Sequence, residues 1–184
     1  MAGGGLMDER ERFFPRAGIA QDGWSTTEEA TATCYCGTVQ LSFPLCKPGF
    51  VVAFVCHCSD CRKITASMFT SGFVILDTHL KHVRGEEDLR QFGQSQTIEQ
   101  KGNFMTNFFC STCGSLMYRR GDTFPGASIL RIGTVDDFKL AETTLRPTIE
   151  QYVKHRVDWI NDIENMAQTE GQASVEEVVG QASV

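Results

Sequence analysis

The cysteines of this chain are spaced in a way that could support metal binding. Seven of the eight cysteines fall into three short clusters within 184 residues. The clusters are Cys34 and Cys36, then Cys56, Cys58 and Cys61, then Cys110 and Cys113. A C-x-C spacing is awkward for a disulfide, and the charged segment 1–16 does not resemble a secretion signal. The sequence therefore favours thiolates that bind metal over cysteines that pair as disulfides.

The first and last clusters together supply four thiolates, the number that closes a tetrahedral structural zinc site. Each pair is followed by a glycine, Gly37 or Gly114, which relieves the crowding of a tight turn whose backbone N–H groups point at the sulfurs. The alternative is that these are ordinary buried cysteines. Spacing alone also permits other partitions, such as the first pair combined with the middle cluster.

The middle cluster offers three thiolates within six residues, and three protein ligands with an open fourth position are typical of catalytic zinc. Three thiolates give a bound Zn²⁺ unit a net charge of −1, which weakens the Lewis acid and favours thiol chemistry over hydrolysis. The alternative is that a further side chain closes the fourth position, with four candidates: Cys46, His57, His79 and His82. Because His57 lies between two ligands in an extended segment, we expect its ring to face away from the metal.

The elements that must position these cysteines are short apolar segments separated by glycine and proline, which predict a mainly β fold with few short helices. The predicted strands cover 39–43, 50–55, 73–76, 104–109, 116–118 and 129–132. Ser59 and Asp60 predict a short capped helical turn, and a weak amphipathic pattern over 157–167 predicts a second helix.

The two ends of the chain differ from its middle. We expect residues 1–32 to form a flexible N-terminal arm, which Phe13, Phe14 and Trp24 could pin to the domain in places. Residues 33–168 are predicted to form one zinc-binding domain. Residues 169–184, with a repeated GQASV sequence, are predicted to form a flexible C-terminal tail.

Composition narrows the classes of partner. The formal net charge is −6 and the isoelectric point is about 5.2, which argues against binding to nucleic acid or anionic membranes. No segment approaches the roughly 20 consecutive apolar residues that span a bilayer. We therefore expect a soluble, cytoplasmic protein whose partner is a small molecule.

The ordered set of motifs resembles one family. The motifs are C-x-C-G, C-H-C-x-x-C-R-K, F-C-x-x-C-G-S, G-T-V-D-D at 133–137 and R-V-D-W at 156–159. Over about 33–168 the chain resembles the glutathione-dependent formaldehyde-activating enzymes, a family that includes the domain of centromere protein V, and it looks particularly like the fungal branch. This resemblance implies a twisted β-sandwich of short antiparallel sheets with two zinc sites. It also implies a carbon–sulfur lyase that joins glutathione to formaldehyde, giving S-(hydroxymethyl)glutathione.

The resemblance also implies a role for each cysteine cluster. The structural ion would be held by Cys34, Cys36, Cys110 and Cys113, and the catalytic ion by Cys56, Cys58 and Cys61. Glutathione carries two carboxylates, so cations are expected near the catalytic ion. Arg62 and Lys63 are the first candidates, with Arg119, Arg120 and Arg131 as further ones, and the alternative for each is an ordinary solvated side chain. Asp136 and Asp137 are predicted to form a turn or helix cap.

Two departures from the family pattern concern the substrate. Ala66 follows Thr65 where many members have glycine, and the segment 146–152 lacks the Pro-x-x-His of many relatives.

Two alternative functions stay open at this point. One is a non-catalytic zinc module that binds a protein, and the other is a zinc enzyme of fungal secondary metabolism with another substrate.

Overall fold

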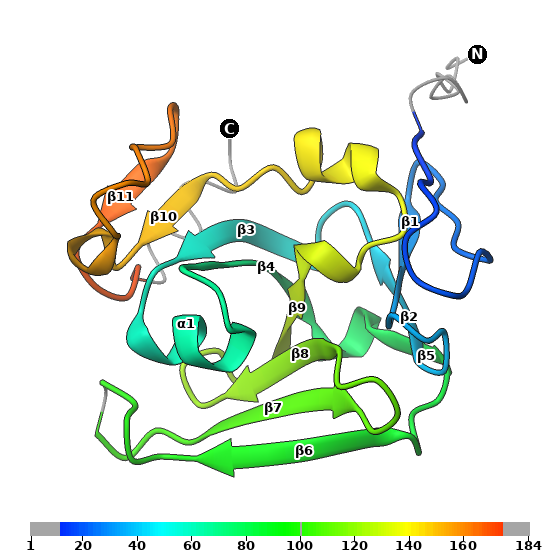
Figure 1. The fold of residues 1–184 in the computed structure, drawn as a ribbon, viewed down its shortest axis with the longest axis horizontal. Coiled ribbons are helices and arrows are strands. Elements are labelled where there is room, and N and C mark those ends of the chain that lie inside the picture. The colour runs from blue at the N-terminus through cyan, green and yellow to red at the C-terminus, as the bar shows by residue number, and fades with distance from the viewer. Residues whose placement is uncertain (1–11, 100, 175–184) are drawn as a thin grey trace.

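The computed structural model describes residues 12–99 and 101–174, and these residues form two β-sheets that pack face to face (Figure 1). A three-stranded sheet has the order β1-β2-β5, and an eight-stranded sheet has the order β11-β10-β3-β4-β9-β8-β7-β6. The strands are β1 (Glu29–Thr33), β2 (Gln40–Pro44), β3 (Phe50–Cys56), β4 (Thr70–Leu76), β5 (Lys81–Arg84), β6 (Leu89–Gln94), β7 (Met105–Cys110), β8 (Leu116–Gly121), β9 (Ala127–Arg131), β10 (Ile149–Gln151) and β11 (Ala167–Thr169).

Helices are few and short. The described part of the chain holds one α-helix, α1, which spans Ser59–Thr65, and its remaining helical turns are of the 3₁₀ type. These turns are η2 (Asp77–His79), η3 (Ile132–Thr134), η4 (Phe138–Glu142) and η5 (Val153–His155). The prediction of a mainly β fold with few short helices is confirmed. Within the described residues no helix has the length and apolar character that crossing a membrane requires.

Strand pairing is antiparallel except at one edge of the large sheet. There β10 runs parallel to both β3 and β11. The chain reaches this edge after leaving β9 through η3 and η4, which carry it across the top of the molecule (Figure 1). This return places the segment after β10 beside the end of β3, where the middle cysteine cluster begins.

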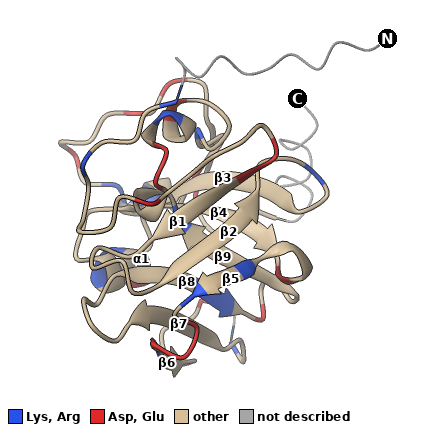
Figure 2. Ribbon diagram, turned by 90° about the vertical axis from the view of Figure 1, so that its right-hand side faces the viewer, with Lys and Arg blue, Asp and Glu red and all other residues tan. Residues whose placement is uncertain are grey.

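The core separates into two clusters because successive side chains of a strand point to opposite faces. Ala53 of β3 and Leu130 of β9 belong to the cluster between the two sheets. Their neighbours Phe54 and Ile129 belong to the second cluster, on the outer face of the large sheet. In Figure 2 the small sheet lies in front of the large one, which is the packing that the first cluster fills. Cys56 shares the outer face with Phe54, and this alternation fixes the side of the sheet on which the middle cysteine cluster lies.

The predicted helix over 157–167 is wrong. This segment consists of turns and irregular backbone and leads into β11 at Ala167. Asn165 has a positive φ of 63°. Asn and Asp side chains bond to nearby backbone groups in non-helical conformations, and Asn161 and Asp162 add two more of them to this segment. The apolar spacing was therefore outweighed by residues that favour turns.

The expected arm and tail lie partly outside the described residues, namely 1–11 and 175–184. Within the expected arm, β1 begins at Glu29, and Phe13 accepts a hydrogen bond from the backbone of Phe138. Their rings make an edge-to-face contact at 6.5 Å between centroids. Within the expected tail, Ala173 is buried against the outer core cluster. The domain bounds stay a prediction.

The helix α1 ends at a residue in the left-handed conformation. Ala66 has φ 51° and ψ 37°, and its N–H bonds back to the helix. This conformation is costly for a residue with a Cβ and is readily adopted by glycine. We expect Ala66→Gly to raise the free energy of unfolding by about 0.5–1 kcal/mol, measured by urea denaturation. The matched control is Ala17→Gly, at an exposed position of ordinary backbone, which should not stabilise; equal effects of the two changes would contradict the strain argument.

Candidate metal centres and the adjoining cavity

Four cysteines from distant parts of the chain meet at one end of the molecule. Cys34 and Cys36 lie in the turn after β1, and Cys110 and Cys113 lie at the end of β7 and in the turn that follows. We call these four the tetrad. Their sulfurs lie within 4.8 Å of one another, with Cys34 and Cys36 at 3.5 Å and Cys36 and Cys110 at 3.7 Å. Zn–S bonds of about 2.3 Å in a tetrahedron place sulfurs roughly 3.8 Å apart, so the tetrad fits a metal ion.

The two turns of the tetrad depend on the glycines that follow each pair. Gly37 has φ 84° and Gly114 has φ 73°, a region that side chains with a Cβ rarely adopt. A Cβ on Gly37 would also lie 2.6 Å from Cβ of Ala20. The backbone N–H of Val39 donates to Sγ of Cys34 at 3.2 Å. The turns therefore hold backbone donors against the sulfurs, as expected from the C-x-C-G and C-x-x-C-G motifs.

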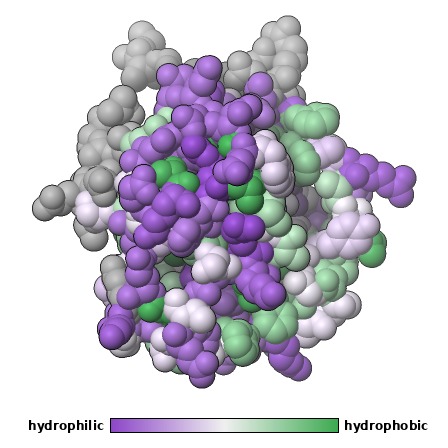
Figure 3. All heavy atoms as spheres, turned by 60° about the vertical axis from the view of Figure 1, so that its left-hand side comes forward, coloured by the Kyte–Doolittle hydropathy of each residue, from purple (hydrophilic) through white to green (hydrophobic). Residues whose placement is uncertain are grey.

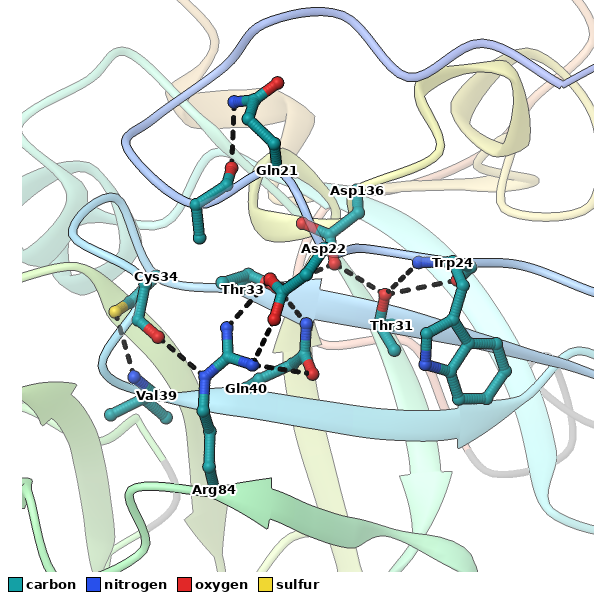
Figure 4. Close-up of polar contacts among 12 residues, drawn as sticks. Gln21, Asp22, Trp24, Thr31, Thr33, Cys34, Val39, Gln40, Arg84 and Asp136 are labelled. Atoms are coloured by element: carbon teal, nitrogen blue, oxygen red, sulfur yellow. Dashed lines mark hydrogen bonds and ion pairs between the residues drawn. The ribbon is translucent and has the colours of Figure 1, made fainter.

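A polar network ties the segment before β1 to the first turn of the tetrad (Figure 4). Arg84 of β5 donates to both carboxylate oxygens of Asp22, at 2.5 and 3.0 Å, and to the carbonyl of Gly37 at 2.8 Å. It also contacts the side-chain oxygen of Gln40 at 3.3 Å. The Arg84 guanidinium lowers the pKa of Asp22. One side chain thus fixes the small sheet against the turn that carries two of the tetrad's sulfurs.

The acidic pair after η3 is structural. Asp136 accepts hydrogen bonds from the hydroxyls of Thr31 and Thr33, at 2.6 and 2.7 Å. Asp137 caps η4 by accepting from the backbone N–H of Lys139 at 3.1 Å. The predicted helix-cap role of this pair is confirmed for Asp137.

The middle cysteine cluster forms a second group, which we call the trio. Cys56 ends β3, Cys58 precedes α1, and Cys61 lies in the first turn of that helix. Sγ of Cys58 accepts the N–H of Cys61 at 3.3 Å, so the helix start itself fixes the position of two sulfurs. All three sulfurs lie within 4.8 Å of one another. A soft three-thiolate donor set at this spacing also fits a metal ion.

No fourth protein ligand joins the trio in the part of the chain that the structure describes. Cys46 is exposed and belongs to neither group. Nδ1 of His79 bonds to the hydroxyl of Thr78, and Nε2 of His82 bonds to the hydroxyl of Tyr118. Among the described residues, the trio is therefore a group of three cysteines that could hold a metal ion without a fourth side chain.

His57 faces away from the trio, as the sequence predicted. Its Nε2 lies 2.8 Å from Oε1 of Glu150 in β10, and both side chains are fully buried. Oε2 of Glu150 accepts from Arg156 at 3.0 Å and from Gln168 at 3.2 Å. Sequence reasoning missed Glu150, because nothing local to the cysteine motif indicates which strand would pair with β3. This buried pair fixes the loop between Cys56 and Cys58 to the neighbouring strand.

Removing the carboxylate of Glu150 leaves Arg156 with only its exposed partner Asp162 and breaks the contact with His57. We expect Glu150→Ala to lower the free energy of unfolding by about 3 kcal/mol, measured by urea denaturation of the metal-loaded protein. The exposed Glu164 provides the control, and Glu164→Ala should change stability by less than about 0.5 kcal/mol. A Glu150→Ala protein as stable as the control would show that the pair does not hold the loop.

Two buried arginines lie on the outer face of the large sheet next to the trio. Nη1 of Arg119 lies 3.3 Å from Sγ of Cys61, and its Nε donates to the sulfur of Met105 at 3.0 Å. Arg131 donates to the hydroxyl of Thr70 at 3.3 Å. Burial lowers the pKa of Arg131 to about 10, which still leaves it charged at neutral pH.

The thiols of the trio ionise unequally. Hydrogen bonding from Cys58 and Cys61, together with burial, raises the pKa of the Cys56 thiol. Hydrogen bonding from Cys56 and Cys58, together with the charge of Arg119, lowers the pKa of the Cys61 thiol. The lowered pKa belongs to the sulfur that lies next to Arg119.

The predicted cations Arg62 and Lys63 follow the trio directly in α1. Arg62 donates to the carbonyl of His155 at 3.2 Å and contacts the sulfur of Met68 at 3.5 Å. Lys63 is exposed. Neither residue lines the cavity beside the trio. The part that each plays in binding a substrate stays a prediction.

A cavity of about 420 Å³ lies beside the trio and is lined by all three of its cysteines. Phe54 and Ile129 contribute an apolar wall, and Arg119, Lys154 and His155 contribute basic groups. This volume falls in the range of about 300–1,000 Å³ that is usual for small-molecule sites. The arrangement therefore combines a group of soft ligands with space for a small polar molecule.

A second cavity, of about 470 Å³, lies between α1 and the strands β6 and β7. It shares four residues with the first cavity, namely Asp60, Thr97, Met105 and Arg119, and Lys63 lines it as well. The hydroxyl of Thr97 donates to the carboxylate of Asp60 at 2.8 Å. Two residues bound to each other thus line both cavities, and both cavities adjoin the same arginine.

The fold and the two cysteine groups define a mainly β protein with two sites that could hold metal ions. A family model described as "Glutathione-dependent formaldehyde-activating enzyme" matches residues 29–155, and the chain belongs to this family. The family resemblance seen in the motifs is thereby confirmed, whereas the fungal branch stays a prediction.

Two further comparisons concern individual proteins. A crystal structure of a Rhodobacter sphaeroides protein matches with a TM-score of 0.43 and 16% sequence identity, over 76% of this chain and 98% of that chain. A search of curated proteins gave no significant match.

Proposed function

We propose that this protein is a zinc-dependent carbon–sulfur lyase that joins the thiolate of glutathione to formaldehyde or a related carbonyl compound. The tetrad would hold a structural zinc ion and the trio a catalytic one. The observation that carries the proposal is the trio, three thiols grouped in the wall of a cavity without a fourth protein ligand among the described residues. Membership of the formaldehyde-activating family supports the same substrates.

The reaction needs a thiolate next to a carbonyl carbon. A free thiol has a pKa of about 8.5, and a zinc ion bound by the trio would supply the Lewis acidity that ionises it at neutral pH. The sulfur electron pair then forms a bond to the carbonyl carbon. The carbonyl π electrons move to oxygen, which takes up one proton, so that thiol and formaldehyde give a hydroxymethyl thioether with no atom lost.

Residues of the cavity can orient the two reactants. Lys154 and His155 lie in its wall, where basic groups suit the carboxylates of glutathione. Tyr152 also lines the cavity, and burial together with a hydrogen bond to Glu99 raises the pKa of its phenol. A phenol that stays protonated adds no negative charge to this wall of the cavity. Phe54 and Ile129 line the same cavity with apolar side chains.

The test is the rate of exchange between formaldehyde and its glutathione adduct, measured by NMR exchange spectroscopy with ¹³C-formaldehyde. We expect the zinc-loaded protein to accelerate the exchange above the spontaneous rate. Absence of acceleration would overturn formaldehyde as the substrate. Acceleration with another carbonyl compound would then favour an enzyme with a different substrate, and binding of thiol without any acceleration would favour a non-catalytic module.

The surface beside this site bears on the protein-binding alternative. On the face drawn in Figure 3, hydrophobic side chains lie in separate patches among hydrophilic ones. Large interaction surfaces are usually contiguous apolar areas. The left and centre of this face, where hydrophilic side chains dominate, therefore offer little apolar surface for protein docking.

A further inference from the structure

Two arginines beside the trio are buried and have no carboxylate partner among the residues that the structure describes. Arg119 is 8% exposed and Arg131 is 5% exposed. Arg119 of β8 pairs with Ile129 of β9, two residues before Arg131, so both arginine side chains lie on the outer face of the large sheet. Arg131 pairs in turn with Gly72 of β4, whose strand neighbours the one that ends at Cys56.

The hydrogen-bond partners of these two guanidinium groups include no carboxylate among the described residues. Over residues 12–99 and 101–174, no carboxylate forms an ion pair with either side chain. Nε and Nη2 of Arg131 are buried and have no hydrogen-bond partner there. An unpaired buried cation is expensive unless an anion lies close by. The thiols of the trio can be anionic, and Arg119 contacts Sγ of Cys61 at 3.3 Å. Arg131 interacts electrostatically with all three of these thiols. Asp60 and Glu99 line the same cavity as Arg119 without forming an ion pair with it.

The net charge of a metal-loaded trio depends on these two arginines. Three thiolates and a divalent ion carry a net charge of −1, and two arginines bring the site to +1. A fourth ligand that is a thiolate brings it to zero, whereas a neutral ligand leaves one buried positive charge. We infer that Arg119 and Arg131 are counter-charges that make the trio site select an anionic sulfur over neutral ligands, an inference that rests on the proposed function.

The two arginines differ in what they can touch. Arg119 lines the cavity and can also contact other parts of a substrate. Arg131 does not line it and therefore acts only through its charge, as a positioning residue for the incoming thiolate. A variant of Arg131 thus separates the electrostatic role from direct recognition of glutathione.

The experiment uses the full chain loaded with cobalt(II), whose absorption reports ligand exchange at a thiolate site. The protein is titrated with 2-mercaptoethanol, which has no carboxylates, and separately with imidazole, which is neutral. We expect Arg131→Met to weaken 2-mercaptoethanol binding about tenfold or more and to leave imidazole binding unchanged or stronger. Arg131→Lys should restore most of the loss, because it restores the charge.

The control is Arg120→Met, on the same strand as Arg119 but bonded to Ser128 and Asp77. It should bind both ligands as the parent protein does. Equal thiol affinity in Arg131→Met and the parent protein, or equal losses for thiol and imidazole, would overturn the inference. If Arg131→Met does not fold, Arg119→Met carries the same expectation and the same contrary outcomes. These results are independent of formaldehyde, so the proposed reaction can fail in the exchange assay while thiol selection is still decided.

Discussion

Cys58→Ser is expected to abolish the acceleration of formaldehyde–glutathione exchange while leaving the fold intact. The substitution separates two roles of this residue. Sγ of Cys58 accepts the N–H of Cys61 at the start of α1, and a serine hydroxyl accepts at such a position equally well. A hydroxyl is, however, a poor replacement for a soft thiolate ligand. We therefore expect the rate above the spontaneous one to fall by about 100-fold or more, which NMR exchange spectroscopy measures.

The control for this change is Cys46→Ser, at an exposed cysteine outside both groups. It should retain the parent rate, and both variants should keep the parent free energy of unfolding within about 1 kcal/mol. Full activity in Cys58→Ser would show that the trio does not carry the reaction. Loss of activity together with loss of fold would assign Cys58 a structural role instead.

The parts of the site that lie close together in sequence could be predicted from it. Cys58 and Cys61 are brought together by one helical turn, and a single residue separates Cys56 from Cys58, so their grouping follows from local geometry. The tetrad joins residues more than seventy positions apart, yet each half is a short turn with its own glycine. Two ligands do not complete a tetrahedral site, so the coordination number of zinc favours combining the two cysteine pairs into one site.

The parts that depend on strand register could not be predicted in this way. Arg119 and Arg131 were not distinguishable from surface arginines, because their burial depends on which face of β8 and β9 packs against α1. Glu150 reaches His57 because β10 pairs in parallel with β3. A single charged residue in a short strand does not indicate which strand will pair with its own, because long-range contacts determine strand pairing.

Removal of metal from the tetrad is expected to unfold the protein. The tetrad connects the turn that follows β1 in the small sheet with the end of β7 in the large sheet. Structural zinc sites contribute roughly 10 kcal/mol or more to small domains, whose net stability is about 5–15 kcal/mol. We expect Cys110→Ser to lower the free energy of unfolding by about 5 kcal/mol or more, measured by circular dichroism together with zinc content.

The comparison with Cys58→Ser decides whether the two sites have different roles. Both variants lose one thiol from a group that could hold a metal. Of the two groups, only the tetrad combines cysteines that follow a strand of the small sheet with cysteines at the end of a strand of the large sheet. We expect Cys58→Ser to keep the cooperative unfolding transition and Cys110→Ser to lose it, with Cys46→Ser unchanged. A Cys110→Ser protein that binds one zinc ion fewer and unfolds at the parent midpoint would contradict a structural role for the tetrad, because the sheets would then be held together by their core alone.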